Sequence, residues 1–99
     1  MFSAKTFDRQ ETLSILFEIF SEALADRYTD YAGAAQAVMG IDTLLSALAS
    51  AKQVPVAAVR AIRPDISELY RIVRDPNGYR PADFRAALAR VAAAVRRLQ

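Results

Sequence analysis

Tyrosines and carboxylates are the side chains of this sequence that could carry acid–base chemistry. The chain has no cysteine and no histidine among its 99 residues, so it lacks thiolate nucleophiles, imidazole bases and the usual zinc ligands. A site built from the remaining groups would need strongly shifted pKa values, and no feature of the sequence indicates such shifts. The residues that such a site would use are Tyr28, Tyr31, Tyr70 and Tyr79 with Asp26, Asp30 or Glu68.

Catalytic and ligand-binding motifs are absent from the sequence. The acidic residues are scattered, and the three glycines, at positions 33, 40 and 78, form no phosphate-binding loop. There is also no EF-hand loop and no nucleophile elbow. The sequence therefore predicts a protein that is not an enzyme and that has no cofactor, no bound metal and no small-molecule substrate.

Positive charge is concentrated in the second half of the chain. Residues 1–50 carry three bases and seven acids, a net charge of −4, whereas residues 51–99 carry ten bases and four acids, a net charge of +6. This asymmetry could attract an acidic partner or nucleic acid to the second half, or it could let two halves attract each other within the fold or across a dimer. We favour the second interpretation, in which the acidic and basic halves attract each other.

A chain of this length has room for one hydrophobic core. Hydrophobic residues make up 54% of it, but polar residues interrupt every apolar stretch before the roughly 20 residues that a membrane span requires. The N-terminal residues lack the features of a secretory signal. We expect a single cytoplasmic helical domain over residues 1–99, with residues 1–7 a poorly ordered lead-in and with no membrane partner.

The first predicted helix begins at a capping box formed by Asp8 and Glu11 and ends near Ala25. Its apolar residues cover well over half of the circumference. One neighbouring helix cannot cover so wide an arc, so we expect this helix to be central to the core or shared with a second chain. The arc consists of Leu13, Ile15, Leu16, Phe17, Ile19, Phe20 and Leu24.

The second predicted helix runs from Asp30 to Ala51, because the apolar spacing keeps the helical period through Gly40. The alternative is a break at Gly40, after which Asp42 would cap a separate helix. Continuity would place Gly33, Gly40, Ala47 and Ala51 on one smooth strip. Tyr31 and Tyr70 have the spacing of core rings with their hydroxyl groups at the rim.

Prolines divide the rest of the chain. Pro55 suits the first turn of a helix and Pro64 cannot continue one, so we predict a short helix over residues 55–62 and another from Ile66 to Arg74. Residues 75–78 have the composition of a type I turn.

Pro81 opens the last predicted helix, which ends near Leu98. Its outer face is nearly all alanine and has arginines along its borders. The alanines of this face are Ala82, Ala86, Ala89 and Ala93.

These elements together predict an all-α fold, a compact bundle of four to five helices in a single domain. Its core is expected to contain Leu13, Leu16, Phe17, Phe20, Leu24, Val38, Ile41, Leu45, Leu48, Val59, Ile62, Leu69, Val73, Phe84, Leu88, Val91 and Val95.

A small protein-interaction module is the function that this sequence favours. An adaptor, inhibitor or assembly factor of this kind would present a helical surface to a protein partner, or to a second copy in a homodimer. We expect its active surface on the basic second half. The predicted partner-binding residues are Arg71, Arg74, Arg85, Arg90 and Arg96.

DNA binding through a helix-turn-helix is the alternative function. One frame runs from Leu48 to Ile62, but its reading face, residues 55–58, offers no hydrogen-bonding side chain to a base edge. A second frame has better chemistry. It takes Ile66 to Arg74 as the reading helix, places Pro64 near the turn, and lets Arg71 and Arg74 contact bases or phosphates.

Overall fold

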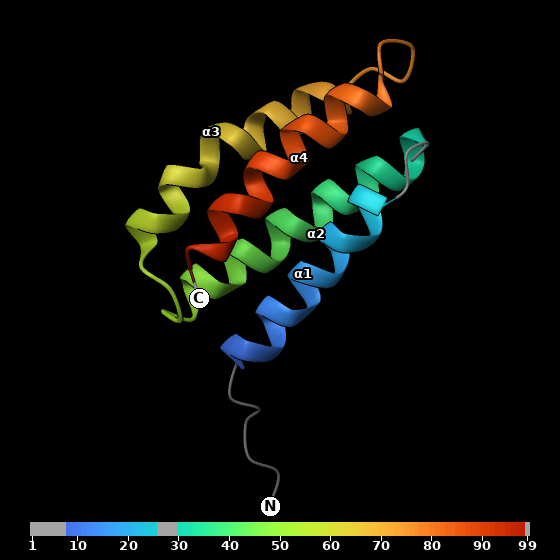
Figure 1. Cartoon of the computed structure of the whole chain (residues 1–99). Coiled ribbons are helices and arrows are strands. Elements are labelled where there is room, and N and C mark those ends of the chain that lie inside the picture. Colours follow the sequence, from blue (N-terminus) through green and yellow to red (C-terminus); the bar gives the residue numbers. More distant parts are fainter. Residues whose placement is uncertain (1–7, 26–29, 99) are drawn as a thin grey trace, which may run out of the picture.

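The regular structure of this chain is entirely helical in the residues that the computed structural model describes, 8–25 and 30–98. The predicted lead-in, residues 1–7, lies outside these ranges. The prediction of an all-α bundle is confirmed, with four helices in the described residues (Figure 1). They are α1 (Arg9–Ala25), α2 (Tyr31–Ser50), α3 (Val56–Ile72) and α4 (Pro81–Arg96).

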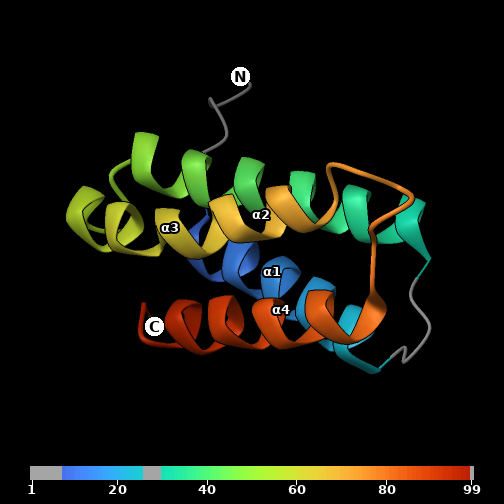
Figure 2. The same ribbon diagram turned by 90° about the horizontal axis from the view of Figure 1, so that it is seen from above.

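The four helices form a closed ring in which each packs against two others. The packed pairs are α1 with α2, α2 with α3, α3 with α4, and α4 with α1. Seen from above, α2 and α3 form one layer of the bundle and α1 and α4 the other (Figure 2). Consecutive helices run in opposite directions, as short connections in a four-helix bundle require.

One stripe of each helix supplies the core. The predicted core is confirmed for most of its members, and side chains such as Leu16, Leu45 and Phe84 are completely buried. Phe17 and Leu24, which we expected in the core, are only half-buried at its edge. The apolar residues of α1 cover a wider arc than its two neighbouring helices can bury, so these two side chains remain at the edge. The buried apolar residues missing from the prediction are Ala23, Ala34, Val54, Ile66, Ala87 and Ala92, and the polar Thr12 is buried as well.

The first two helices begin as their sequences indicate. The Asp8 carboxylate accepts hydrogen bonds from the backbone N–H groups of Gln10 and Glu11, at 3.0 and 3.2 Å. Asp30 caps α2 in the same way by accepting from the Gly33 N–H at 2.7 Å. Each cap satisfies donors that have no partner inside the helix.

Helix α2 is continuous through Gly40, so the alternative of a break there is wrong. A Cβ atom at Gly40 would lie 3.5 Å from Cδ1 of Ile19, which places this glycine against α1. Asp42 does not cap a helix. It lies on the side of α2 that faces α3, where its carboxylate accepts hydrogen bonds from Arg63 and Tyr70.

The prediction of two short helices on either side of Pro64 is wrong, because α3 is one helix from Val56 to Ile72. Pro64 removes the hydrogen bond that would reach the Arg60 carbonyl. Both residues are exposed, so water can solvate that carbonyl. The buried spacing continues across the proline through Val59, Ile62 and Ile66, and this burial outweighs the local penalty.

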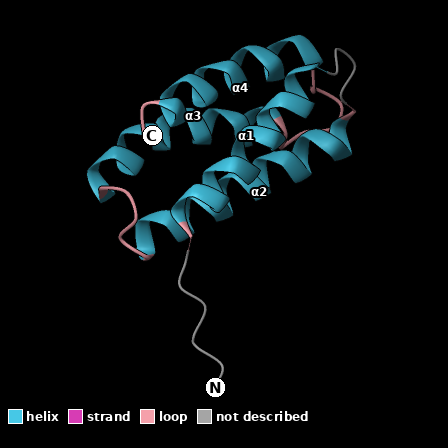
Figure 3. Cartoon of the chain, turned by 60° about the horizontal axis from the view of Figure 1, so that its bottom comes forward, coloured by secondary structure: helices cyan, strands magenta, loops and turns pink. Residues whose placement is uncertain are grey.

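The connections from α2 to α3 and from α3 to α4 are short and contain hydrogen-bonded turns (Figure 3). Lys52 follows α2 with a positive φ of 58°, and the Gln53 N–H donates to the Leu48 carbonyl at 2.9 Å, the pattern of a Schellman motif. Before α4, the Gly78 N–H donates to the Asp75 carbonyl at 3.1 Å, which confirms the turn expected there. Pro81 occupies the first turn of α4 as predicted.

One helix in the described ranges, α2, is long and apolar enough to cross a membrane by composition. Its most apolar side chains, including Val38, Ile41 and Leu45, are buried in the bundle core, and its Asp42 pairs with Arg63. These contacts are compatible with a soluble protein.

Replacing Pro64 tests whether burial holds α3 together against its proline. We expect Pro64→Ala to raise the free energy of unfolding by about 1–3 kcal/mol, because alanine restores a backbone hydrogen bond and removes a steric clash. Urea denaturation measures the change. Pro55→Ala, just before α3, is the control and should change stability by less than about 1 kcal/mol. A loss of stability in Pro64→Ala would contradict this account of α3.

Candidate functional site

A polar cluster joins α2 to α3 at mid-length and is centred on Asp42. Its carboxylate accepts hydrogen bonds from Nη1 of Arg63 at 2.8 Å and from the Tyr70 hydroxyl at 2.7 Å. Nη2 of Arg63 also donates to Oγ of Ser46 at 3.0 Å. We call these four residues the Asp42 cluster. One acidic group thus receives two donors from α3, which connects the two helices at this point.

The tyrosine of the Asp42 cluster has an altered acidity. Its hydrogen bond to Asp42 raises the pKa of the Tyr70 hydroxyl above the ordinary value of 10.0, and partial burial and the negative charge of Asp42 act in the same direction. The hydroxyl is therefore a stable donor at neutral pH rather than a base. The expectation of a core ring is wrong for Tyr70, because 39% of the residue is exposed.

Two apolar hollows lie along the groove between α2 and α3, one on each side of the Asp42 cluster. We call this surface the α2–α3 groove. The first hollow, of about 320 Å³, is lined by Ala35, Met39, Tyr70, Val73 and Arg74. The second hollow, of about 200 Å³, is lined by Ala49, Val56, Val59, Arg60 and Arg63.

The α2–α3 groove also carries most of the large apolar side chains that the described residues expose. Met39 is 60% exposed, Val56 is 52% exposed and Tyr70 is 39% exposed. Met39 and Tyr70 line the first hollow, and Val56 lines the second. The fourth such residue, Ile15, lies on α1. Exposed apolar side chains gathered at one groove, rather than scattered singly, are typical of an interaction surface.

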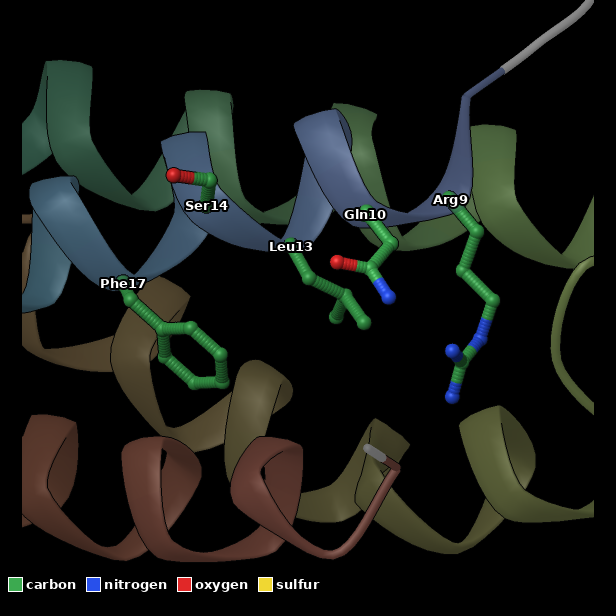
Figure 4. A pocket seen from close by; sticks show the side chains of 5 residues that line it. All are labelled: Arg9, Gln10, Leu13, Ser14 and Phe17. Carbon is green, nitrogen blue, oxygen red and sulfur yellow. The ribbon is translucent and has the colours of Figure 1, made fainter.

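A further hollow, of about 290 Å³, lies beside α1 (Figure 4). The side chains of Leu13 and Phe17 point from α1 toward α4 there, and Arg9 reaches the end of α4, where its guanidinium donates to the Leu98 carbonyl. This hollow therefore lies on the α1–α4 side of the bundle.

The alanine-rich outer face of α4, which we call the alanine strip, is largely exposed to solvent. Ala82, Ala86 and Ala89 are exposed, and Ala93 is half-buried. With Ala side chains alone, this face lets a neighbouring backbone approach closely.

The five arginines predicted to bind a partner are not brought together at one place. Arg74 lines the α2–α3 groove, whereas Arg90 and Arg96 are exposed on α4. Arg71 is exposed and forms an ion pair with Glu68, and the hydrogen bond from this arginine lowers the pKa of the Glu68 carboxyl. Such surface pairs contribute little to stability.

Arg85 holds two helices together. Its Nε and Nη2 atoms donate to the carbonyl oxygen of Leu24 at 3.3 and 3.1 Å. That carbonyl belongs to the last turn of α1, where no intrahelical donor is available. A positive charge there also interacts favourably with the helix dipole. Partner binding through the five arginines stays a prediction.

The structure overturns one of the two helix-turn-helix frames. Pro64 lies inside α3, so there is no turn before Ile66 and no separate reading helix. The other frame has a turn between α2 and α3, but the residues that begin α3 offer no side-chain donor or acceptor to a base edge.

The Asp42 cluster and the two hollows are the features that sequence reasoning missed. The available signal was the position of Asp42 near the apolar arc of α2, which is unusual for a solvated carboxylate. Its partners lie 21 and 28 residues further along the chain, so only the packing of α2 on α3 reveals them.

Comparison with known proteins adds no relative to this description. No known protein family matches the chain, and neither a curated protein nor a solved structure matches it significantly. The class is therefore defined by the structure alone, as an all-α four-helix bundle with a grooved α2–α3 face.

Mutation can distinguish an arginine that stabilises the bundle from one that is only exposed on its surface. We expect Arg85→Ala to lower the free energy of unfolding by about 1–2 kcal/mol, because it leaves the Leu24 carbonyl without its charged donor. Arg90→Ala is the matched control on the same helix and should stay within about 0.5 kcal/mol of the wild type. Chemical denaturation measures both, and equal losses would show that Arg85 has no special structural role.

The raised pKa of Tyr70 predicts a specific spectroscopic titration. Tyrosinate absorbance should contain a component at higher pH than the ordinary tyrosine value of 10.0 that is lost in Tyr70→Phe and moves to lower pH in Asp42→Asn. The stability that the Tyr70 hydroxyl contributes should be fully present below about pH 10 and be lost as the pH rises through the raised pKa. If Tyr70→Phe leaves the high-pH part of the titration unchanged, the hydrogen bond to Asp42 is contradicted.

Proposed function

We propose that this chain is a small protein-interaction module, an adaptor, inhibitor or assembly factor that acts through its helical surface and forms a homodimer. The observation that carries this proposal is the α2–α3 groove. Three exposed apolar residues, Met39, Val56 and Tyr70, lie along it, beside two apolar hollows. Burial of such side chains by a partner is the main source of affinity in protein interfaces.

Charge on neighbouring helices supports self-association. A twofold axis through the α1–α4 side would place α1 of one copy on α4 of the other, and the alanine strip of α4 would let the helices approach closely. The charged residues of α1 are Arg9, Glu11, Glu18 and Glu22. Those of α4 are Asp83, Arg85, Arg90 and Arg96. The acidic helix of each copy would then meet the basic helix of its partner.

Capture from the native host tests the interaction function. The wild-type protein and the variant Arg71→Glu/Arg74→Glu are used as baits after nuclease treatment. We expect the wild type to retain specific proteins that the variant retains several-fold less, because the positive charge at and just after the C-terminal end of α3 is reversed, while the melting temperatures stay within a few degrees of each other.

The matched control for the capture experiment is Arg80→Glu/Arg97→Glu, which makes the same change in net charge at exposed sites elsewhere. It should retain the same proteins as the wild type. A parallel capture without nuclease treatment that recovers nucleic acid and no specific protein would favour the alternative function and contradict this proposal.

Light scattering after size exclusion tests the homodimer. At high micromolar concentration the wild type should have the mass of two chains, and Ala89→Glu should have the mass of one, because it places an acid against the acidic helix of the second copy. Ala57→Glu, at an exposed position of α3, is the control and should remain dimeric. A monomeric wild type would remove self-association from the proposal.

A further inference from the structure

We propose that the α2–α3 groove binds an acidic amphipathic helix of a partner protein, whose two apolar anchors lie fourteen residues apart. This inference rests on the proposed interaction function and names its partner class. The partner helix would lie along the groove, place one anchor in each hollow and pair its carboxylates with arginines at the two ends.

The separation of the hollows sets the spacing of the anchors. Val59 lines one hollow and Val73 lines the other. These two residues are fourteen positions apart in the chain, a separation of about 21 Å at the rise of an α-helix. A partner helix that follows the groove repeats its contact face after the same number of residues, because positions i and i+14 differ by only about 40° around the axis. The groove therefore matches four turns of helix rather than a short loop.

The Asp42 cluster restricts the middle of the partner helix. It bridges α2 and α3 between the hollows, with donors and acceptors that already satisfy one another. A large apolar side chain at position i+7 would lie over this bridge and would gain little from covering it. A small residue there fits between the anchors.

Charge selects an acidic partner. Arg74 lines the first hollow and Arg60 lines the second, and within the described ranges neither forms an ion pair. Both are exposed. The acid of the groove, Asp42, is already paired with Arg63. The unpaired charge at each end is thus positive, and glutamate or aspartate beside each anchor complements it.

Met39 is suited to hold the anchor in the first hollow. It is the most exposed of the large apolar residues among those described, and its unbranched thioether side chain adapts to the shape of an apolar partner. Helical grooves that receive amphipathic helices commonly use such side chains.

A designed peptide tests the inference directly. The probe is a fluorescent helix-forming peptide with two leucines fourteen positions apart, alanine midway between them and glutamates beside each leucine. Fluorescence anisotropy should show saturable binding to the wild-type protein. We expect affinity to fall on the order of ten-fold in Met39→Glu and roughly three-fold or more in Arg74→Glu, because these changes remove an anchor contact and an ion pair.

Matched controls distinguish the groove from general stickiness. Ile15→Glu changes the exposed apolar residue of α1, and Arg97→Glu reverses an exposed charge outside the groove; both should bind the peptide as the wild type does. A peptide with lysine in place of glutamate, and one with leucines ten positions apart, should each bind at least several-fold more weakly. Amide chemical shifts that change on binding should map to α2 and α3.

Several outcomes would overturn this inference. Equal affinity for the acidic and basic peptides, or binding that Met39→Glu leaves unchanged, would exclude the groove as an acidic-helix site. If Met39→Glu instead makes a dimeric protein monomeric, a second copy occupies the groove. Failure with the peptides while the wild type still captures host proteins would reject this partner class and leave the proposed function standing.

Discussion

Burial of apolar side chains between four antiparallel helices is the constraint on which the other features of this protein depend. Each helix presents one stripe to the centre, and side chains such as Leu16, Ile41, Leu69 and Phe84 are removed from water almost completely. This burial keeps α3 continuous across Pro64, although the proline costs a backbone hydrogen bond. It also aligns α2 with α3 closely enough for their polar side chains to meet.

The Asp42 cluster follows from that alignment. A carboxylate on α2 and two donors on α3 satisfy one another at the rim of the core, where an unpaired charge would be costly. The cluster also divides the α2–α3 groove into two apolar hollows. One interhelical contact thus contributes to the register of the bundle and to the shape of the α2–α3 groove.

Arginine has two physical roles on this scaffold. Arg85 and Arg9 donate to backbone carbonyls at opposite ends of the α1–α4 pair, so they stabilise the closure of the ring. Arg60 and Arg74 border the hollows of the groove, where their charge is available to a partner. All four side chains carry the same positive charge. Their roles differ because Arg9 and Arg85 lie within reach of a backbone carbonyl, whereas Arg60 and Arg74 lie beside an apolar hollow.

Local patterns in the sequence predict the helical class and three of the four helices, because caps and apolar periodicity act within a few residues. Asp8 and Pro81 mark the starts of α1 and α4, and the unbroken spacing through Gly40 predicts the whole of α2. Packing between helices determines that α3 passes through Pro64, that Phe17 and Leu24 lie at the edge of the core, and that Arg85 binds the end of α1. These outcomes depend on the free energy of burial and on donors and acceptors contributed by other helices, which no local pattern in the chain encodes.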